Sequence, residues 1–205
     1  MTFTDQRDTP DDQRSFNERL VTVLEQLNIS YGIGGSVAAM SYSQTSRLTI
    51  DVDVMFDPNR EALALFVQEV EHWQVYIDPL ETIFEYNVPS QLPINIMDGL
   101  AGAKADLFLV RHDGLDASIM TRLRRRKLYV KPDFSAWFMS PEDVILYKLI
   151  YFKKSEGTSQ KHPIDIRSML RAVGAELDLA YMERWAREVS VFELWQVVWD
   201  DFCYA

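Results

Sequence analysis

The sequence has few of the residues that build covalent or metal cross-links. It contains one cysteine, Cys203, and three histidines among 205 residues. A single cysteine excludes an intrachain disulfide, and no Cys/His pairs have the spacing of a zinc site. The fold must therefore depend on apolar burial, and 47% hydrophobic residues allow one sizeable core or two small ones. A chain without disulfides suits a reducing compartment, so we expect a cytoplasmic protein.

Long apolar runs and excess positive charge are also missing. No window approaches about 18 uninterrupted apolar residues, so we expect no membrane span, and the polar first twelve residues do not resemble a signal peptide. A formal net charge of −10 argues against nucleic-acid binding over the whole surface. One basic segment departs from this trend: Arg122, Arg124, Arg125, Arg126, Lys127 and Lys131. It is either a site for a polyanion or a solvated charged face.

Sequence periodicity divides the chain into three parts. Residues 1–14 are mainly polar and are expected to form a disordered lead-in, with structure starting near Ser15. Residues 15–131 mix strand and helix patterns, which predicts an α/β domain. Ser140 followed by Pro141 is typical of a helix start, and helical patterns continue from there. We therefore expect residues 132–205 to form a helical region packed on the α/β domain.

Two aspartates in one predicted strand are the most informative feature. Asp51 and Asp53 lie in a β-branched and apolar stretch, and side chains two residues apart on a strand share a face, about 6.6 to 7 Å apart at Cα. Their charges repel unless protons or cations intervene, and Mg²⁺ is the usual cation at all-oxygen sites. A later predicted strand carries Asp106, with Lys104 on the same face. Three carboxylates are what a two-metal site for phosphoryl chemistry requires.

A glycine turn precedes these strands. Gly34, Gly35 and Ser36 follow a short apolar run and precede a helix-forming segment. Glycines let a backbone approach a ligand closely, and the N–H groups at a helix start can bind phosphate. We expect Ser36 to contribute its hydroxyl and to cap the helix.

In this order, the glycine turn, the Asp-x-Asp strand and the third aspartate resemble the polymerase-β-like nucleotidyltransferase superfamily. The form Arg47-Leu48-Thr49-Ile50-Asp51-Val52-Asp53 is most similar to AbiEii-type and related minimal nucleotidyltransferases, many of them toxin-antitoxin components. Ser140–Ile145, Lys148 and Asp165-Ile166 look like the C-terminal helical region of that group. The resemblance implies an α+β fold, with a mixed β-sheet flanked by helices and a C-terminal helical bundle.

The resemblance also implies an activity, namely transfer of a nucleoside monophosphate from an NTP such as ATP to a hydroxyl, with release of pyrophosphate. It assigns Asp51, Asp53 and Asp106 as ligands of Mg²⁺ or Mn²⁺, with Asp106 assisting deprotonation of the acceptor. The residues it places at the nucleotide are Gly34, Gly35, Ser36, Arg47, Thr49, Lys104 and Lys148.

The acceptor and the partners stay open at this point. An RNA end would suit the basic segment, a protein side chain would suit the acidic surface, and an antibiotic-like small molecule is a third alternative. A different class of function is a catalytically silent module that binds a cognate toxin or antitoxin protein. A weaker reading is a two-metal phosphoester hydrolase.

One segment departs from the pattern of that group. Relatives often carry Lys-Asp shortly before the Asp-Ile pair, whereas this chain reads Lys161-His162-Pro163-Ile164-Asp165-Ile166. Asp165 is therefore either a site residue or a structural partner of Lys148 or Arg167. His162 is either a ligand or base, or a solvated residue at a helix start.

Overall fold

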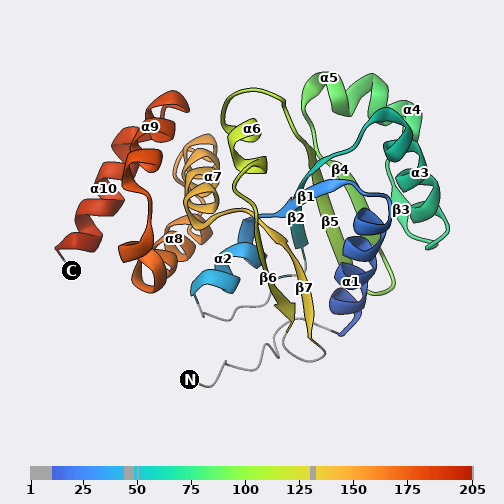
Figure 1. Ribbon diagram of the computed structural model, residues 1–205, viewed down its shortest axis with the longest axis horizontal. Helices are drawn as coiled ribbons and strands as arrows, with labels where there is room; N and C mark the ends of the chain where they lie inside the picture. The colour runs from blue at the N-terminus through green and yellow to red at the C-terminus, as the bar shows by residue number, and fades with distance from the viewer. Residues whose placement is uncertain (1–10, 44–48, 50, 130–132, 205) are drawn as a thin grey trace.

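The computed structural model describes residues 11–43, 49, 51–129 and 133–204, and within these ranges a seven-stranded mixed sheet forms the centre of the molecule (Figure 1). The strand order is β3-β4-β5-β2-β1-β7-β6. The strands are β1 (Ser30–Ile33), β2 (Asp51–Asp57), β3 (Tyr76–Ile77), β4 (Ile94–Asp98), β5 (Ala103–Leu109), β6 (Arg124–Tyr129) and β7 (Phe134–Phe138).

Helices surround this sheet in two groups. The helical elements are α1 (Asp11–Gln26), α2 (Gly35–Ser43), α3 (Arg60–Glu71), α4 (Leu80–Thr82), the π-helix η1 (Ile83–Asn87), α5 (Val88–Ser90), α6 (Gly114–Met120), α7 (Pro141–Lys154), α8 (Lys161–Val173), the 3₁₀-helix η2 (Gly174–Glu176), α9 (Leu179–Glu188) and α10 (Phe192–Cys203). Helices α7 to α10 gather on one side of the molecule, and α1 lies with α3 on the other (Figure 1). The α+β prediction, with its C-terminal helical group, is confirmed.

The centre of the sheet is a parallel pair, β2 and β5, and its register brings Asp53 opposite Asp106. In β2, Val52 and Val54 are 1% exposed and alternate with the aspartates, as the strand pattern predicts. Strand β4 pairs antiparallel with β5 through the glycine-bearing turn 99–102. The alternation turns Val52, Val54 and Phe56 of β2 to one face and leaves its carboxylates, together with Met55, on the opposite face.

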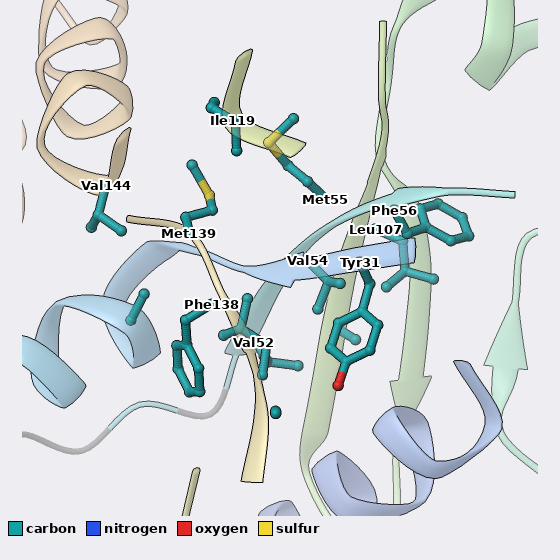
Figure 2. Close-up of a cluster of buried hydrophobic side chains, with 14 of the residues drawn as sticks. Tyr31, Val52, Val54, Met55, Phe56, Leu107, Ile119, Phe138, Met139 and Val144 are labelled. Atoms are coloured by element: carbon teal, nitrogen blue, oxygen red, sulfur yellow. The ribbon is translucent and has the colours of Figure 1, made fainter. Parts of the chain in front are cut away.

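The hydrophobic core crosses between the sheet and its covering helices. Figure 2 shows Val52, Val54 and Leu107 from the central strands near Tyr31 and Phe138 of the neighbouring strands. The same apolar cluster includes Val144 of α7, so the C-terminal helices share one core with the sheet. Each fully buried aliphatic side chain contributes roughly 1.5 to 3 kcal/mol.

Two boundaries differ from those expected. Helix α1 begins at Asp11, so residues 11–14 are not part of a lead-in. Strand β7 (Phe134–Phe138) joins the sheet between β1 and β6, so the division expected after residue 131 cuts through the sheet. The short β3 strand was also missed by sequence patterns. Both strands depend on pairing with distant segments, which a local pattern does not reveal.

No helix in the described part of the chain combines the length and apolar character needed to cross a lipid bilayer.

Candidate active site

The β2–β5 pair presents its polar residues as neighbouring rungs. Asp51 is opposite Lys104, and Asp53 is opposite Asp106. Asp106 Oδ2 lies 3.0 Å from Lys104 Nζ. The sequence prediction that these carboxylates leave one face of the sheet is consistent with this register, because alternate residues of each strand point the same way.

The glycine turn is held directly against Asp53. The N–H of Gly34 donates to the Asp53 carbonyl oxygen at 2.8 Å, which fixes the turn to β2. Gly35 has φ +57°, and a Cβ built there would lie 1.7 Å from Asp53 Oδ2. Only glycine combines this left-handed conformation with such a close approach. The turn and the carboxylate therefore form one compact unit.

Ser36 has a different local role from the one predicted. Helix α2 begins at Gly35, so Ser36 lies inside its first turn and is not the N-cap. Its Oγ donates to Asp165 Oδ2 at 3.4 Å. With Ser36 as the N-cap the helix would have started at Val37, so the expected position was wrong by two residues: the N–H of Ala38 already donates to the Gly34 carbonyl oxygen at 3.0 Å.

Lys148 and Asp165 connect the C-terminal helices to this site. Lys148 Nζ lies 2.6 Å from Asp165 Oδ2, and the two side chains are 5% and 8% exposed. Asp165 therefore has the structural partnership with Lys148 that the sequence left open. Since Ser36 donates to the same carboxylate oxygen, the pair also connects α2 with α7 and α8.

A cavity of about 290 Å³ opens between the carboxylates and the C-terminal helices. Gly34, Gly35, Ser36, Asp53, Asp106 and Lys148 supply its polar lining, with His162. Its apolar and aromatic lining consists of Val54, Met55, Phe108, Met139, Val144, Tyr147 and Tyr151. The pocket is of the size and mixed character expected of a small-molecule site.

Sequence reasoning missed the aromatic part of this lining, although signals for it were present. Met55 and Phe108 follow Asp53 and Asp106 by two residues, so the alternation that paired the aspartates also places them on that face. Tyr151 lies one helical turn after Lys148 on α7. His162, the second residue of α8, is half-buried and stacks on Tyr151 with ring centroids 6.3 Å apart, so it belongs to the cavity wall and is not fully solvated.

Three other predicted site residues in the described part of the chain do not line this cavity, namely Thr49, Asp51 and Lys104. Asp51 and Thr49 line a separate, smaller hollow beside Tyr129, and Thr49 Oγ1 donates to the Asp51 carbonyl oxygen at 3.3 Å. Arg47 lies outside the described residues. Their proposed contacts with metal or nucleotide remain predictions.

Electrostatics single out Asp53. Burial raises the pKa of the Asp53 carboxyl, and the charge of Asp106 raises it further, while Lys148 acts in the opposite direction. The hydrogen bond to Asp106 raises the pKa of Lys104, which keeps its ammonium charged. Raised carboxyl pKa values beside a second carboxylate are typical of functional sites.

Asp53 and Asp106 suit a divalent cation as a pair, better than the three aspartates Asp51, Asp53 and Asp106 do together. Asp106 Oδ1 is buried and has no hydrogen-bond partner, an arrangement that costs free energy unless a ligand compensates it. Carboxylate oxygens are ligands that Mg²⁺ and Mn²⁺ accept. Among the described residues, however, no three Asp, Glu, His or Cys side chains lie close enough to hold an ion together. Asp53 and Asp106 thus fit a divalent cation, and Asp51 does not lie close enough to bind the same ion.

The basic segment is paired within the fold. Arg122 lies 3.1 Å from Glu142, and Arg124 lies 3.6 Å from the same carboxylate. The remaining described members are also engaged: Arg125 with Glu25, Arg126 with the Ser41 carbonyl oxygen, and Lys127 with Asp133. Lys131 lies outside the described residues. The segment is therefore neither a simple solvated face nor a free cationic surface, and the reason for expecting an RNA partner is weakened.

Asp143, beside this ion cluster, makes stability depend on pH. Burial raises the pKa of Asp143 to about 6, against the opposing hydrogen bonds from Ser140 and Tyr181. The folded state therefore binds a proton more tightly than the unfolded state, and this contribution to stability is full below about pH 4 and is lost as pH rises through about 6. The expected loss is roughly 2 to 3 kcal/mol.

Urea unfolding of the wild type and of Asp143→Asn between pH 4 and 7 tests this prediction. Other titrating groups contribute to both proteins, so the difference between the two curves isolates Asp143. The free energy of unfolding of the wild type should fall relative to that of the variant as pH rises. Parallel curves would show that Asp143 titrates normally.

A mixed sheet whose adjacent strands carry paired aspartates beside a glycine turn and a helix start is the architecture of the nucleotidyltransferase fold. Solved structures agree. ANT(2'')-Ia in complex with adenylyl-2''-tobramycin has a TM-score of 0.62 at 15% identity, over 87% of this chain and 97% of that chain. The lincomycin-bound lincosamide antibiotic adenylyltransferase LnuA has a TM-score of 0.53 at 12% identity, over 80% of this chain and 98% of that chain.

A third similar structure is an antigenic nucleotidyltransferase-like protein from Paracoccidioides brasiliensis, with a TM-score of 0.51 at 18% identity over 80% of this chain and 77% of that chain. No protein-family model matches the chain, and no curated protein has a matching sequence. At these identities the similarity establishes the fold, and the activity has to be argued from the site.

Proposed function

We propose that this protein is a metal-dependent nucleotidyltransferase that transfers a nucleoside monophosphate from an NTP to a hydroxyl of a small-molecule acceptor, releasing pyrophosphate. The observation that carries the proposal is the facing pair Asp53 and Asp106, pressed against the Gly34–Ser36 turn at the floor of a cavity of about 290 Å³. A carboxylate pair alone serves many reactions. Its position beside a helix start suited to phosphate favours nucleotide chemistry.

Each residue has a proposed task. The first N–H groups of α2 lack intrahelical partners, so the Gly35–Ser36 backbone is suited to the β- and γ-phosphates. Lys148 supplies positive charge at the same cavity. Asp53 and Asp106 would hold Mg²⁺ or Mn²⁺, which when bound neutralises phosphate charge and lowers the pKa of an attacking hydroxyl. We also propose that Asp106 accepts the acceptor's proton.

The proposed acceptor is a small molecule for three reasons. The basic segment that suggested RNA is largely paired with acids of the same chain. One similar structure is a complex with adenylyl-2''-tobramycin, and another is bound to lincomycin. Tobramycin and lincomycin are small hydroxyl-bearing antibiotics. The apolar and aromatic lining of the cavity also suits a small organic molecule.

A labelling experiment tests the proposal. The purified protein is incubated with Mg²⁺ and each of the four NTPs labelled at the α-phosphate, with separate pools of small molecules, RNA and protein as acceptors. Asp53→Asn should abolish labelling. Asp57→Asn, a change at the far end of the same strand, is the matched control and should retain it.

Each result of this experiment has a definite meaning. Label in the small-molecule pool supports the full proposal, and label in RNA or protein would replace the acceptor. Release of free labelled monophosphate would indicate a hydrolase. Labelling that persists in Asp53→Asn would remove this residue from the site.

A second candidate is a catalytically silent module that binds a protein partner, such as a toxin-antitoxin component. It is favoured by the absence, among the described side chains, of three ligands gathered around one point. Melting temperatures measured with Mn²⁺ and a non-hydrolysable ATP analogue discriminate the two, because a ligand that binds the native state must stabilise it. An unchanged melting temperature would favour the silent module.

A further inference from the structure

Three alternate rungs of the β2–β5 pair carry different chemistry along one face. Alternate residues of a strand share a face, so these rungs lie in one row. The facing residues are Asp51 and Lys104, then Asp53 and Asp106, then Met55 and Phe108. The carboxylate pair in the middle therefore has a cation of the protein on one side and an apolar pair on the other.

The two oxygens of Asp106 are in different environments. Oδ2 lies 3.0 Å from Lys104 Nζ and accepts its hydrogen bond. Oδ1 is buried and has no hydrogen-bond partner. One half of the carboxylate is thus neutralised by the chain itself, and the other half is left for a ligand.

The charges of the row indicate how many ions it can hold. Asp53 and Asp106 carry two negative units when both are ionised, and Lys104 cancels one of them, so a single divalent cation already exceeds the remaining charge. Lys148 adds positive charge at the same cavity, although it is paired with Asp165 at 2.6 Å. A second divalent ion would have to approach the ammonium of Lys104, which Coulomb repulsion opposes.

We propose that Lys104 is a resident cation of this site: its ammonium stands where a second divalent ion would otherwise bind, so that without nucleotide the protein takes up one divalent ion, on Asp53 and Asp106. The inference rests on the proposed function for the identity of the carboxylate site. Lys104 acts as a positioning residue, since it holds Asp106 through Oδ2 and leaves Oδ1 directed to the ion.

Mn²⁺ binding, followed by titration calorimetry and by the electron paramagnetic resonance signal of free Mn²⁺, tests the inference without reference to activity. The proteins are the wild type, Lys104→Met, Lys104→Arg and the control Lys127→Met, in which another strand lysine paired with an aspartate is replaced. The wild type should bind one ion. Lys104→Met should bind Mn²⁺ on the order of tenfold more tightly or take up a second ion, because a positive charge a few ångströms away has been removed.

Lys104→Arg and Lys127→Met should both behave as the wild type. The inference is overturned if Lys104→Met keeps the affinity and the stoichiometry of the wild type, or if the wild type binds two ions or none. These outcomes differ from a failure of the proposed function. If the wild type binds one Mn²⁺ but labels no acceptor, only the proposed transferase activity is contradicted. If the wild type transfers the nucleotide but Lys104→Met binds Mn²⁺ with unchanged affinity and stoichiometry, only the role of Lys104 is contradicted.

Discussion

Asp53→Asn is expected to reduce nucleotidyl transfer by about a thousandfold or more, which corresponds to roughly 4 kcal/mol of lost transition-state stabilisation. Asparagine keeps the shape of the side chain and removes the charge that faces Asp106 and would hold the metal ion. The fold should survive. Because burial and Asp106 both disfavour the ionised form of Asp53, the free energy of unfolding is expected to be unchanged or to rise by about 1 kcal/mol.

Two measurements check this prediction together. Single-turnover transfer gives the rate, and urea unfolding gives the stability of the same preparation. Asp57→Asn should leave the rate near that of the wild type, because Asp57 lies at the end of β2 beside His112. A variant that loses activity only because it unfolds would assign Asp53 a structural role instead.

Gly35→Ala is expected to be the most disruptive small substitution in the chain. Its Cβ would lie 1.7 Å from Asp53 Oδ2 and 2.6 Å from Asp53 Cγ, and φ +57° is unfavourable for alanine. Either the turn or the carboxylate must move. We expect a loss of about 3 kcal/mol or more in the free energy of unfolding, together with loss of transfer.

Gly102→Ala is the matched control for this substitution. Gly102 has φ +68°, and a Cβ there meets no atom within 4 Å. The free energy of unfolding of this variant should fall by only about 1 kcal/mol, because alanine is unfavourable at this φ angle. Urea unfolding of both variants separates backbone strain from steric overlap with Asp53. Equal losses would mean that the turn moves away from Asp53 at little cost.

The parts of the fold that contain their own pattern were predictable from the sequence. Strand β2, the β4–β5 hairpin and the start of α7 each carry alternation, a glycine turn or a cap within a few residues. The relation between Asp53 and Asp106 followed from two such strands and from the resemblance to nucleotidyltransferases. The contact of Gly35 with Asp53 was not predictable, because it depends on how β1 and β2 pair.

Interactions between distant segments were the main source of error. Arg122 appeared to belong to a free basic segment, but its carboxylate partner Glu142 lies on α7. Strand β7 has only five residues, and its strand character comes from β1 and β6 on either side. A local pattern records neither the partner of a charge nor the neighbour of a strand.

The position of β7 has a consequence for the modularity of this protein. The N–H of Met139 donates to the Ile33 carbonyl oxygen at 2.9 Å, so the end of β7 runs beside the end of β1. The chain therefore enters the Gly34–Ser36 turn and the α7 helix from adjacent points of one sheet. The sheet and the C-terminal helices are not separable modules, and neither truncation before Phe134 nor recombination at that point would preserve the floor of the cavity.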